Sequence, residues 1–216
     1  NPTTELPIED EVSPTLANYF FKSGETMYYA GEGNEHAPFQ LNTMWLSNQY
    51  VQQIIDNGGV ITQQIYRITN NEIQLIYNEM IEFEPVSFEL DKLDALETID
   101  IMLKAPIKNG TQFDHKTMQY PVEVTVPLAT FEDAVLVSEE DETGTMKYYY
   151  VEQYGLVKRE FITEDGYVVT SSLASIGEPP SQSTEGTPTS LDELEQITRY
   201  LETGDETYLV GVSPEM

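Results

Sequence analysis

The sequence predicts a mainly β protein: an antiparallel meander that forms a strongly curved sheet or a partly open barrel, with little helix. Three observations support this fold class. The 216 residues include 14 tyrosines, which favour strands. Apolar and polar residues alternate in many short segments, as they do in half-buried strands. Turn sequences such as Asn57-Gly58-Gly59 and Asp165-Gly166 separate the segments and favour hairpins.

The pattern is clearest between Met27 and Ile68, where three or four β-segments follow one another. Gly31 and Gly33 are interpreted as bulge or turn positions because glycine tolerates positive φ. In Phe39–Trp45 every second residue is apolar or small, which is typical of a strand with one buried face. The other segments are Met27–Ala30, Tyr50–Ile55 and Val60–Ile68.

Later segments show the same alternation of apolar and polar residues between turn sequences, so about ten strands are expected in all. Residues 80–100 are rich in Asp and Glu and are interpreted as an exposed loop or short helix. Leu16–Lys22 is either a short helical turn or the lead into the first strand. So many strands rarely stay flat, which favours a curved sheet, with a two-sheet sandwich as the alternative. The later strands are expected at 73–77, 98–103, 118–126, 134–137, 147–151, 156–163 and 167–173.

Composition divides the chain into four parts. Residues 1–15 are predicted to be an N-terminal tether, and residues 16–176 a β-rich domain. Residues 177–189 contain mainly Pro, Ser, Thr, Gly and Glu and are predicted to be a linker. Residues 190–216 contain a helix-capping pattern and a hairpin-like stretch. This last segment either docks on the main domain or begins a second domain.

The charge is strongly negative, with 38 acidic and 10 basic residues and a net charge of −28. Such a surface repels phosphate backbones and anionic membrane leaflets, which argues against nucleic-acid binding and against direct membrane binding. It also favours solubility. The absence of cysteine excludes disulfides and cysteine-based zinc sites. No apolar run approaches the ~20 residues of a membrane span.

Several short sequence segments, taken in order from about residue 19 to 176, resemble those of a group of uncharacterised envelope lipoproteins of Firmicutes. The resemblance implies an extracytoplasmic protein on the outer face of the cell membrane, with residues 1–15 following a lipid-anchored cysteine. In some relatives a GerMN-type domain follows, and residues 198–212 resemble its first hairpin. The family carries no known catalytic residues. The matching segments are Tyr28–Glu35, Val51–Gln53 with Asn57–Gly59, Lys104–Thr111, Phe131–Val137 and Tyr148–Lys158.

The residues themselves predict no catalytic group, no metal site and no cofactor. The two histidines, His36 and His115, each stand beside an acidic residue, but their spacing favours exposed loop positions over a zinc site. The sequence contains no Gly-x-Ser-x-Gly motif, which argues against a Ser-His-Asp triad. Glu139–Gly144 is the densest acidic run; it lacks the spacing of an EF-hand loop and is interpreted as a solvated turn instead of a calcium site.

The predicted function is a non-enzymatic binding or scaffold module of a cell-envelope lipoprotein. Its expected partners are an envelope protein, a glycan or a hydrophobic ligand; the residues that bind it and the oligomeric state are not identified. Tyrosines on a concave face could line a groove, although shared core packing is the simpler explanation. The alternative function is a carrier of a lipid or other hydrophobic ligand in a half-barrel, which requires a deep apolar cavity.

Overall fold

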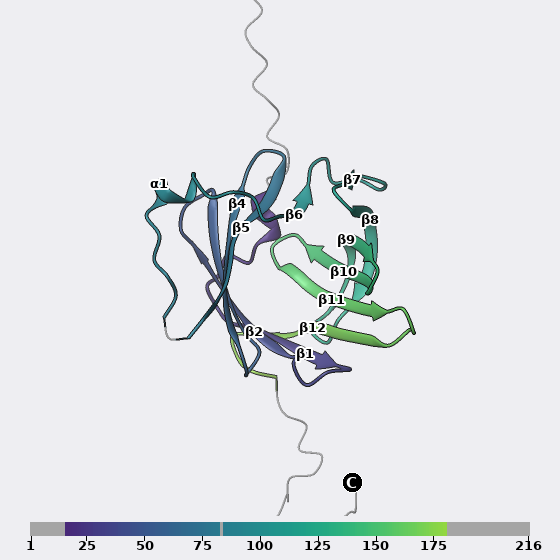
Figure 1. Cartoon of the computed structure of the whole chain (residues 1–216). Helices are drawn as coiled ribbons and strands as arrows, with labels where there is room; N and C mark the ends of the chain where they lie inside the picture. Colours follow the sequence, from purple (N-terminus) through teal and green to yellow (C-terminus); the bar gives the residue numbers. More distant parts are fainter. Residues whose placement is uncertain (1–15, 83, 181–216) are drawn as a thin grey trace, which may run out of the picture. The chain divides into compact units, whose positions relative to one another are not determined.

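The fold was analysed in a computed structural model, which describes residues 16–82 and 84–180. These residues form one twelve-stranded antiparallel sheet, preceded by a short 3₁₀-helix η1 and interrupted by a one-turn helix α1 (Figure 1). The predicted fold class is therefore confirmed, with one curved sheet in place of a two-sheet sandwich. The elements are η1 Leu16–Tyr19, β1 Met27–Glu32, β2 Phe39–Trp45, β3 Tyr50–Asp56, β4 Ile61–Ile68, β5 Glu72–Ile81, α1 Leu90–Leu93, β6 Asp100–Lys104, β7 Gln112–Phe113, β8 Lys116–Thr125, β9 Thr130–Asp141, β10 Gly144–Val151, β11 Gly155–Thr163 and β12 Val168–Ile176.

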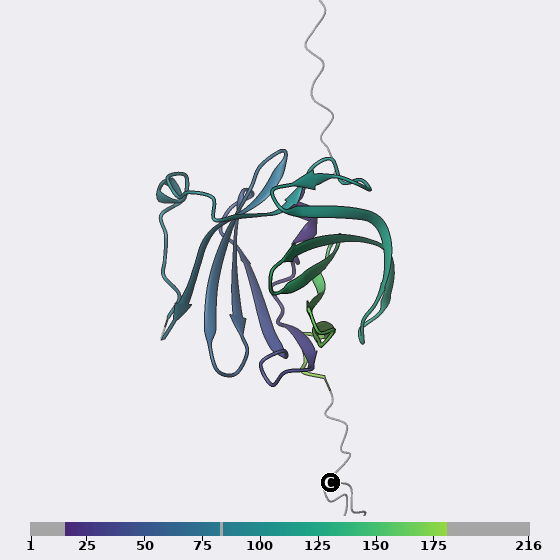
Figure 2. The same cartoon turned by 45° about the vertical axis from the view of Figure 1, so that its right-hand side comes forward.

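The strand order is β6-β5-β4-β3-β2-β1-β12-β11-β10-β9-β8-β7. Two six-stranded meanders are thus joined through their first and last strands, with Tyr29 opposite Leu173 and Gly31 opposite Ser171. Strands β6 and β7 follow each other in the chain but form the two outer edges of the sheet. Strong curvature turns the two meanders into facing walls, so the sheet is nearly closed with one unsealed seam (Figure 2).

A buried ion pair bridges this seam. Lys116, at the start of β8, has a side chain that is only 3% exposed, and its ammonium donates to both carboxylate oxygens of Asp100 on β6 at 2.6 and 2.5 Å. It also donates to the backbone carbonyl of Ile101 at 2.9 Å. The two edge strands, β6 and β7, do not pair through their backbones. Instead, the charge-assisted hydrogen bonds of Lys116 to Asp100 and to the Ile101 carbonyl connect the two sides of the seam.

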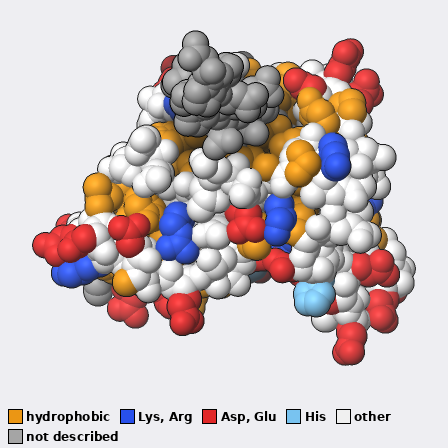
Figure 3. Space-filling model, turned by 90° about the horizontal axis from the view of Figure 1, so that it is seen from above, with side chains coloured by type: hydrophobic (Ala, Val, Ile, Leu, Met, Phe, Trp, Pro, Cys, Tyr) orange, Lys and Arg blue, Asp and Glu red, His pale blue; other side chains and the backbone are white. Residues whose placement is uncertain are grey.

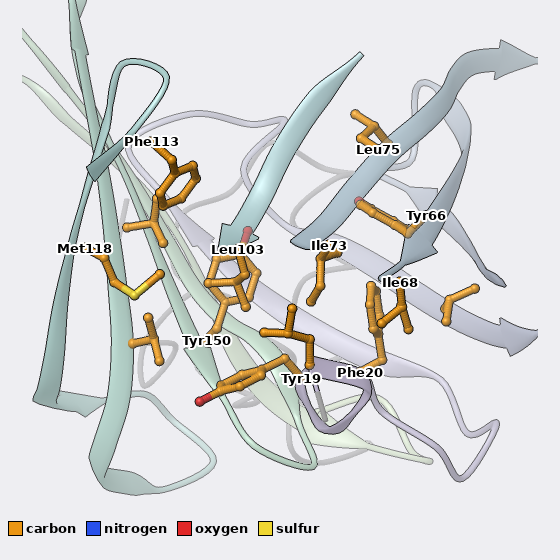
Figure 4. Packing of buried hydrophobic residues seen from close by; sticks show 14 residues of the cluster. Tyr19, Phe20, Tyr66, Ile68, Ile73, Leu75, Leu103, Phe113, Met118 and Tyr150 are labelled. Atoms are coloured by element: carbon orange, nitrogen blue, oxygen red, sulfur yellow. The ribbon is translucent and has the colours of Figure 1, made fainter. Parts of the chain in front are cut away.

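Apolar side chains from both walls fill the upper part of the sheet's interior (Figure 4). Helix η1 supplies Leu16 and Tyr19, and the next residue, Phe20, packs against Trp45 and Tyr66 with ring centroids 6.0 and 5.3 Å away. The open alternative for residues 16–22 is therefore decided in favour of a short helical turn. A second interior cluster of Met27, Tyr29, Phe39, Leu41, Val124, Val126, Ala134, Val151, Val157 and Leu173 continues the filling.

The acidic segment between β5 and β6 is mostly exposed but is fixed to the sheet at a few points. Leu93 of α1 is fully buried against Tyr50, Ile65 and Ile76 on the outer face of β3–β5. The buried amide of Gln63 donates to the carbonyl of Val86 and accepts from its N–H, which fixes the segment to the sheet. The interpretation as an exposed loop or short helix is therefore confirmed, and a few widely spaced apolar residues anchor this mostly acidic stretch.

The strand boundaries differ most from the sequence prediction in β9. The prediction placed a strand only at 134–137, but β9 has twelve residues and extends into the acidic run as far as Asp141. Cross-strand pairing with β8 and β10 on both sides supports this length despite the charged ends. The described helices and strands lie within residues 16–176, and the division into four parts stays a prediction. Residues 1–15 and 181–216, with the predicted tether and C-terminal segment, lie outside the described residues.

Gly31 lies inside β1, where the sequence predicted a bulge or turn. A Cβ atom there would stand 2.1 Å from the backbone N of Pro38 and 2.5 Å from the carbonyl C of Ala37, because the β1–β2 loop folds back over the strand. We expect Gly31→Ala to lower the free energy of unfolding by about 2–3 kcal/mol through overpacking. Urea denaturation followed by Trp45 fluorescence measures this change.

Gly59→Ala is the matched control for Gly31→Ala. The nearest atoms to a Cβ at Gly59 lie at 3.8 Å or more, and its φ is not in the left-handed region, so little change in stability is expected. Equal unfolding midpoints for the two variants would contradict the explanation by close backbone approach.

Candidate functional site

The candidate site is a pocket of about 260 Å³ on the concave face of the sheet. Strands β10, β11 and β12 form its wall, and the loop between β1 and β2 forms its rim. The lining residues are Asn34, His36, Ala37, Met146, Tyr148, Arg159, Phe161, Val169 and Ser171.

Strand register places the wall residues in two rows. Tyr148, Arg159 and Ser171 are directly opposite one another across β10, β11 and β12. Met146, Phe161 and Val169 form the neighbouring row, two residues along each strand. Because alternate residues share one face, both rows point to the side that also carries the buried ring of Tyr150. The pocket therefore has one polar row and one apolar row.

Arg159 is the only cationic side chain among the pocket residues. Its Nε donates to Ser171 Oγ at 3.0 Å, and Ser171 Oγ donates to the carbonyl of Ala37 at 2.6 Å. The guanidinium carbon lies 4.5 Å from the ring centroid of Phe39, which in turn stacks on Tyr29 at 4.1 Å. This stack and the serine relay fix the direction of the guanidinium before any ligand arrives.

The rim loop is fastened to the β11–β12 hairpin. The hydroxyl of Tyr167 donates to the carbonyl of Gly33. Gly33 has φ +83°, and a Cβ on it would lie 2.4 Å from the carbonyl O of Val168, so only glycine allows this approach. Asn34 Oδ1 accepts the N–H of His36 at 2.8 Å. Gly33 is thus a turn position, as predicted, and it sets the rim in place.

Among the described Lys and Arg side chains, four make ion pairs and five, including Arg159, make none. Lys92, Lys104, Lys116 and Lys158 each have a carboxylate oxygen within 3 Å. Within residues 16–82 and 84–180, no carboxylate oxygen comes within ion-pair distance, 4.0 Å, of Arg159. Burial lowers the pKa of Arg159 from its usual value, because desolvation disfavours the charged form. The guanidinium therefore stands in the pocket without a counter-ion.

Tyr148 adds a neutral donor beside Arg159. Burial raises the pKa of its hydroxyl, with Glu139 raising it further and Arg159 opposing the shift, so the group is protonated at neutral pH. In the view from above, acidic side chains lie mainly toward the edges of the visible face (Figure 3). The pocket thus presents a positive charge on a molecule with a net charge of −28.

The two histidines both occupy exposed positions, as predicted. His36 lies on the rim of the pocket, and its Nε2 stands 3.4 Å from the exposed carboxylate of Glu35. His115 lies between β7 and β8 and is not a pocket residue. Among the described residues, no group of three or more His, Asp or Glu side chains is arranged to hold a metal ion.

Of the acidic run Glu139–Gly144, residues 139–141 end β9 and only Glu142 and Thr143 form the turn into β10, so the turn interpretation holds for these two residues alone. Asp141 Oδ1 accepts hydrogen bonds from the N–H and hydroxyl of Thr143, which lower the pKa of the Asp141 carboxyl. Its carboxylate closes the turn. Five of the twelve described tyrosines are buried, and Tyr148 lines the pocket; the buried ones are Tyr19, Tyr29, Tyr50, Tyr66 and Tyr150.

Sequence reasoning did not identify Arg159 or Ser171 as site residues. One signal was available for Arg159: it falls between Val157 and Phe161 at the alternate positions of β11, so its side chain points inward. A charged residue at an inward position is a reason to suspect a site. The contributions of the rim loop and of Phe39 depend on β1–β12 pairing, which no local pattern reveals.

The side chains of the pocket are arranged to contact a ligand. The pocket offers hydrogen-bond donors and apolar walls, but no carboxylate lines it and Ser171 is engaged with Arg159 and Ala37. Among residues 16–82 and 84–180, no helix has the length and apolar character needed to cross a bilayer.

Comparisons with known proteins give only distant similarities. No protein-family model and no curated protein matches the chain. Two solved structures are similar. One is a "putative exported protein with YmcC-like fold" from Bacteroides fragilis, with 11% identity, a TM-score of 0.44, and 74% of this chain and 98% of that chain covered. The other is a "putative lipoprotein" from Parabacteroides distasonis, with 16% identity, a TM-score of 0.41, and 73% and 97% covered.

Both similar proteins come from Bacteroidetes, and nothing in the comparisons supports the narrower resemblance to Firmicutes lipoproteins or to a GerMN domain. Neither similarity identifies a ligand or an activity for this chain. What the comparisons supply is a coarse likeness to exported proteins and lipoproteins.

Proposed function

We propose that this chain is a non-enzymatic binding module that works outside the cytoplasm at the cell envelope, and that its ligand site is the concave-face pocket. The observation that carries the proposal is the guanidinium of Arg159, which Ser171 and Phe39 hold in the pocket without a counter-ion. Keeping a partly buried cation unpaired costs stability, and such costs are typical of binding sites. The envelope location rests on the sequence resemblance and the acidic, cysteine-free composition.

The carrier alternative receives less support. It requires a deep, continuous apolar cavity, but two hydrophobic clusters fill the interior between the walls. The pocket of about 260 Å³ is smaller than a typical site for a drug-sized ligand, and it is partly polar. A long acyl chain therefore does not fit in this pocket.

The proposal is tested by nuclear magnetic resonance on the full chain, with a panel of acidic sugars, amino acids and short peptides as probes. We expect at least one probe to shift the amide resonances of residues 34–37 and 159–171 and to be recovered chemically unchanged. Binding that shifts only other residues, no binding by any probe, or conversion of a probe to product would each overturn the proposal. Protection of the native protein from protease added to intact spheroplasts would overturn the envelope location.

A further inference from the structure

We infer that the pocket takes a small monoanionic ligand in which a carboxylate is attached to a compact apolar body. This inference rests on the proposed function and adds the chemical class of the ligand. Two features of the pocket carry it: the orientation of the Arg159 guanidinium and the apolar row of wall residues beside it.

The guanidinium presents a planar, charged donor surface to the pocket. Its Nε is engaged by Ser171, and in the described residues no hydrogen-bond acceptor is found for the two terminal nitrogens. Two parallel N–H groups match the two oxygens of a carboxylate. The hydroxyl of Tyr148, directly opposite Arg159 in the strand register, supplies a further donor on the same face. The ring of Phe39 already packs against the guanidinium, so the Arg159 side chain loses little conformational freedom when a ligand binds.

The remaining walls select for an apolar body. Met146, Phe161 and Val169 form one side of the pocket, and no carboxylate of the described residues lines it. A single arginine balances one negative charge, so a monoanion fits better than a phosphate dianion, which other proteins bind with several cations or backbone N–H groups. The small volume limits the body to about the size of one ring or a short branched chain.

The net negative charge of the protein repels anions, so a pocket that presents a cation to an anionic ligand stands out from its surroundings. With 38 acidic residues, the chain offers many carboxylates that could pair with Arg159, yet none of those described does so. At physiological salt the Debye length is about 8 Å, so distant surface carboxylates are screened while a contact inside the pocket is not. An anion that enters the pocket supplies the missing counter-ion.

The test is isothermal titration calorimetry on the full chain with benzoate, its neutral isostere benzamide, acetate and inorganic phosphate. We expect benzoate to bind at least tenfold more tightly than benzamide, acetate and phosphate. Arg159→Gln is expected to reduce benzoate affinity at least tenfold, and Arg159→Lys by a smaller factor, because a lysine keeps the charge but lacks the planar donor pair.

Lys147→Gln is the matched control, since it changes the net charge equally but lies on the other face of β10, next to Tyr148. It is expected to leave benzoate affinity unchanged. Equal binding of benzoate and benzamide, equal losses in the glutamine variants, or tighter binding of phosphate would overturn the inference. If Arg159→Gln does not fold, the comparison of benzoate with benzamide on the unaltered chain still decides. A pocket that binds none of the four probes, or only benzamide, removes the inference and leaves the proposed function to be decided by the nuclear magnetic resonance panel.

Discussion

Replacing Lys116 by methionine is expected to lower the free energy of unfolding by about 3 kcal/mol, at the lower end of the cost of breaking a buried ion pair. Methionine keeps the length and volume of the side chain but removes the ammonium that contacts Asp100 and the carbonyl of Ile101. The Asp100 side chain is 39% exposed, so water partly solvates the carboxylate left behind and limits the loss. Urea denaturation measures the effect.

Lys108→Met is the control for the seam. Lys108 lies on the exposed connection between β6 and β7, and no ion pair is found for it among the described residues. The variant removes the same charge from the same region and is expected to change stability by less than about 0.5 kcal/mol. Asp100→Asn should destabilise in the same direction as Lys116→Met, because it leaves the buried ammonium with only the more distant carboxylate of Glu139, at 3.9 Å. Equal stability of Lys116→Met and Lys108→Met would refute the role of the seam.

Replacing Phe20 by alanine is expected to cost about 3–4 kcal/mol, the usual range for deleting a buried phenylalanine. Phe20 is 5% exposed and packs edge-on against Trp45 and at a tilt against Tyr66, so its removal leaves a cavity between η1 and the sheet. Trp45 is the only tryptophan, and its fluorescence in the folded state should change with the loss of the neighbouring ring.

The neighbouring Phe21 provides the comparison for this variant. Phe21 is only partly buried and lies against the second interior cluster, so Phe21→Ala should cost clearly less than Phe20→Ala. A smaller loss for Phe20→Ala than for Phe21→Ala would mean that η1 does not fill the interior in solution.

Local patterns predicted most of the strands because each hairpin carries its own signal. Alternation at Phe39–Trp45 and the turn at Asn57–Gly59 appear in the structure as strand β2 and the β3–β4 turn. Local patterns could not show that β1 pairs with β12, since that contact joins residues far apart in the chain. The seam was not predicted either, because Lys116 and Asp100 meet through their side chains across two edges that residues 105–111 connect without strand pairing.

The candidate site was less predictable than the fold for a related physical reason. Its charged residue belongs to β11, its orienting hydroxyl to β12, and its aromatic support to β2, so only the completed sheet brings them together. The sequence emphasised His36 and the acidic run because those residue types are chemically prominent. His36 does reach the rim of the pocket, whereas Asp141 closes a turn.

The most direct test of the central claim is to observe the Nε–H resonance of Arg159 while benzoate is added to the ¹⁵N-labelled full chain. The sequence has only three arginines, at positions 67, 159 and 199, and the Arg159→Gln variant assigns the signal. We expect the Arg159 resonance to shift and saturate, while that of Arg67, on the outer face of β4, stays in place. An Arg159 resonance that does not move at saturating benzoate would contradict the account.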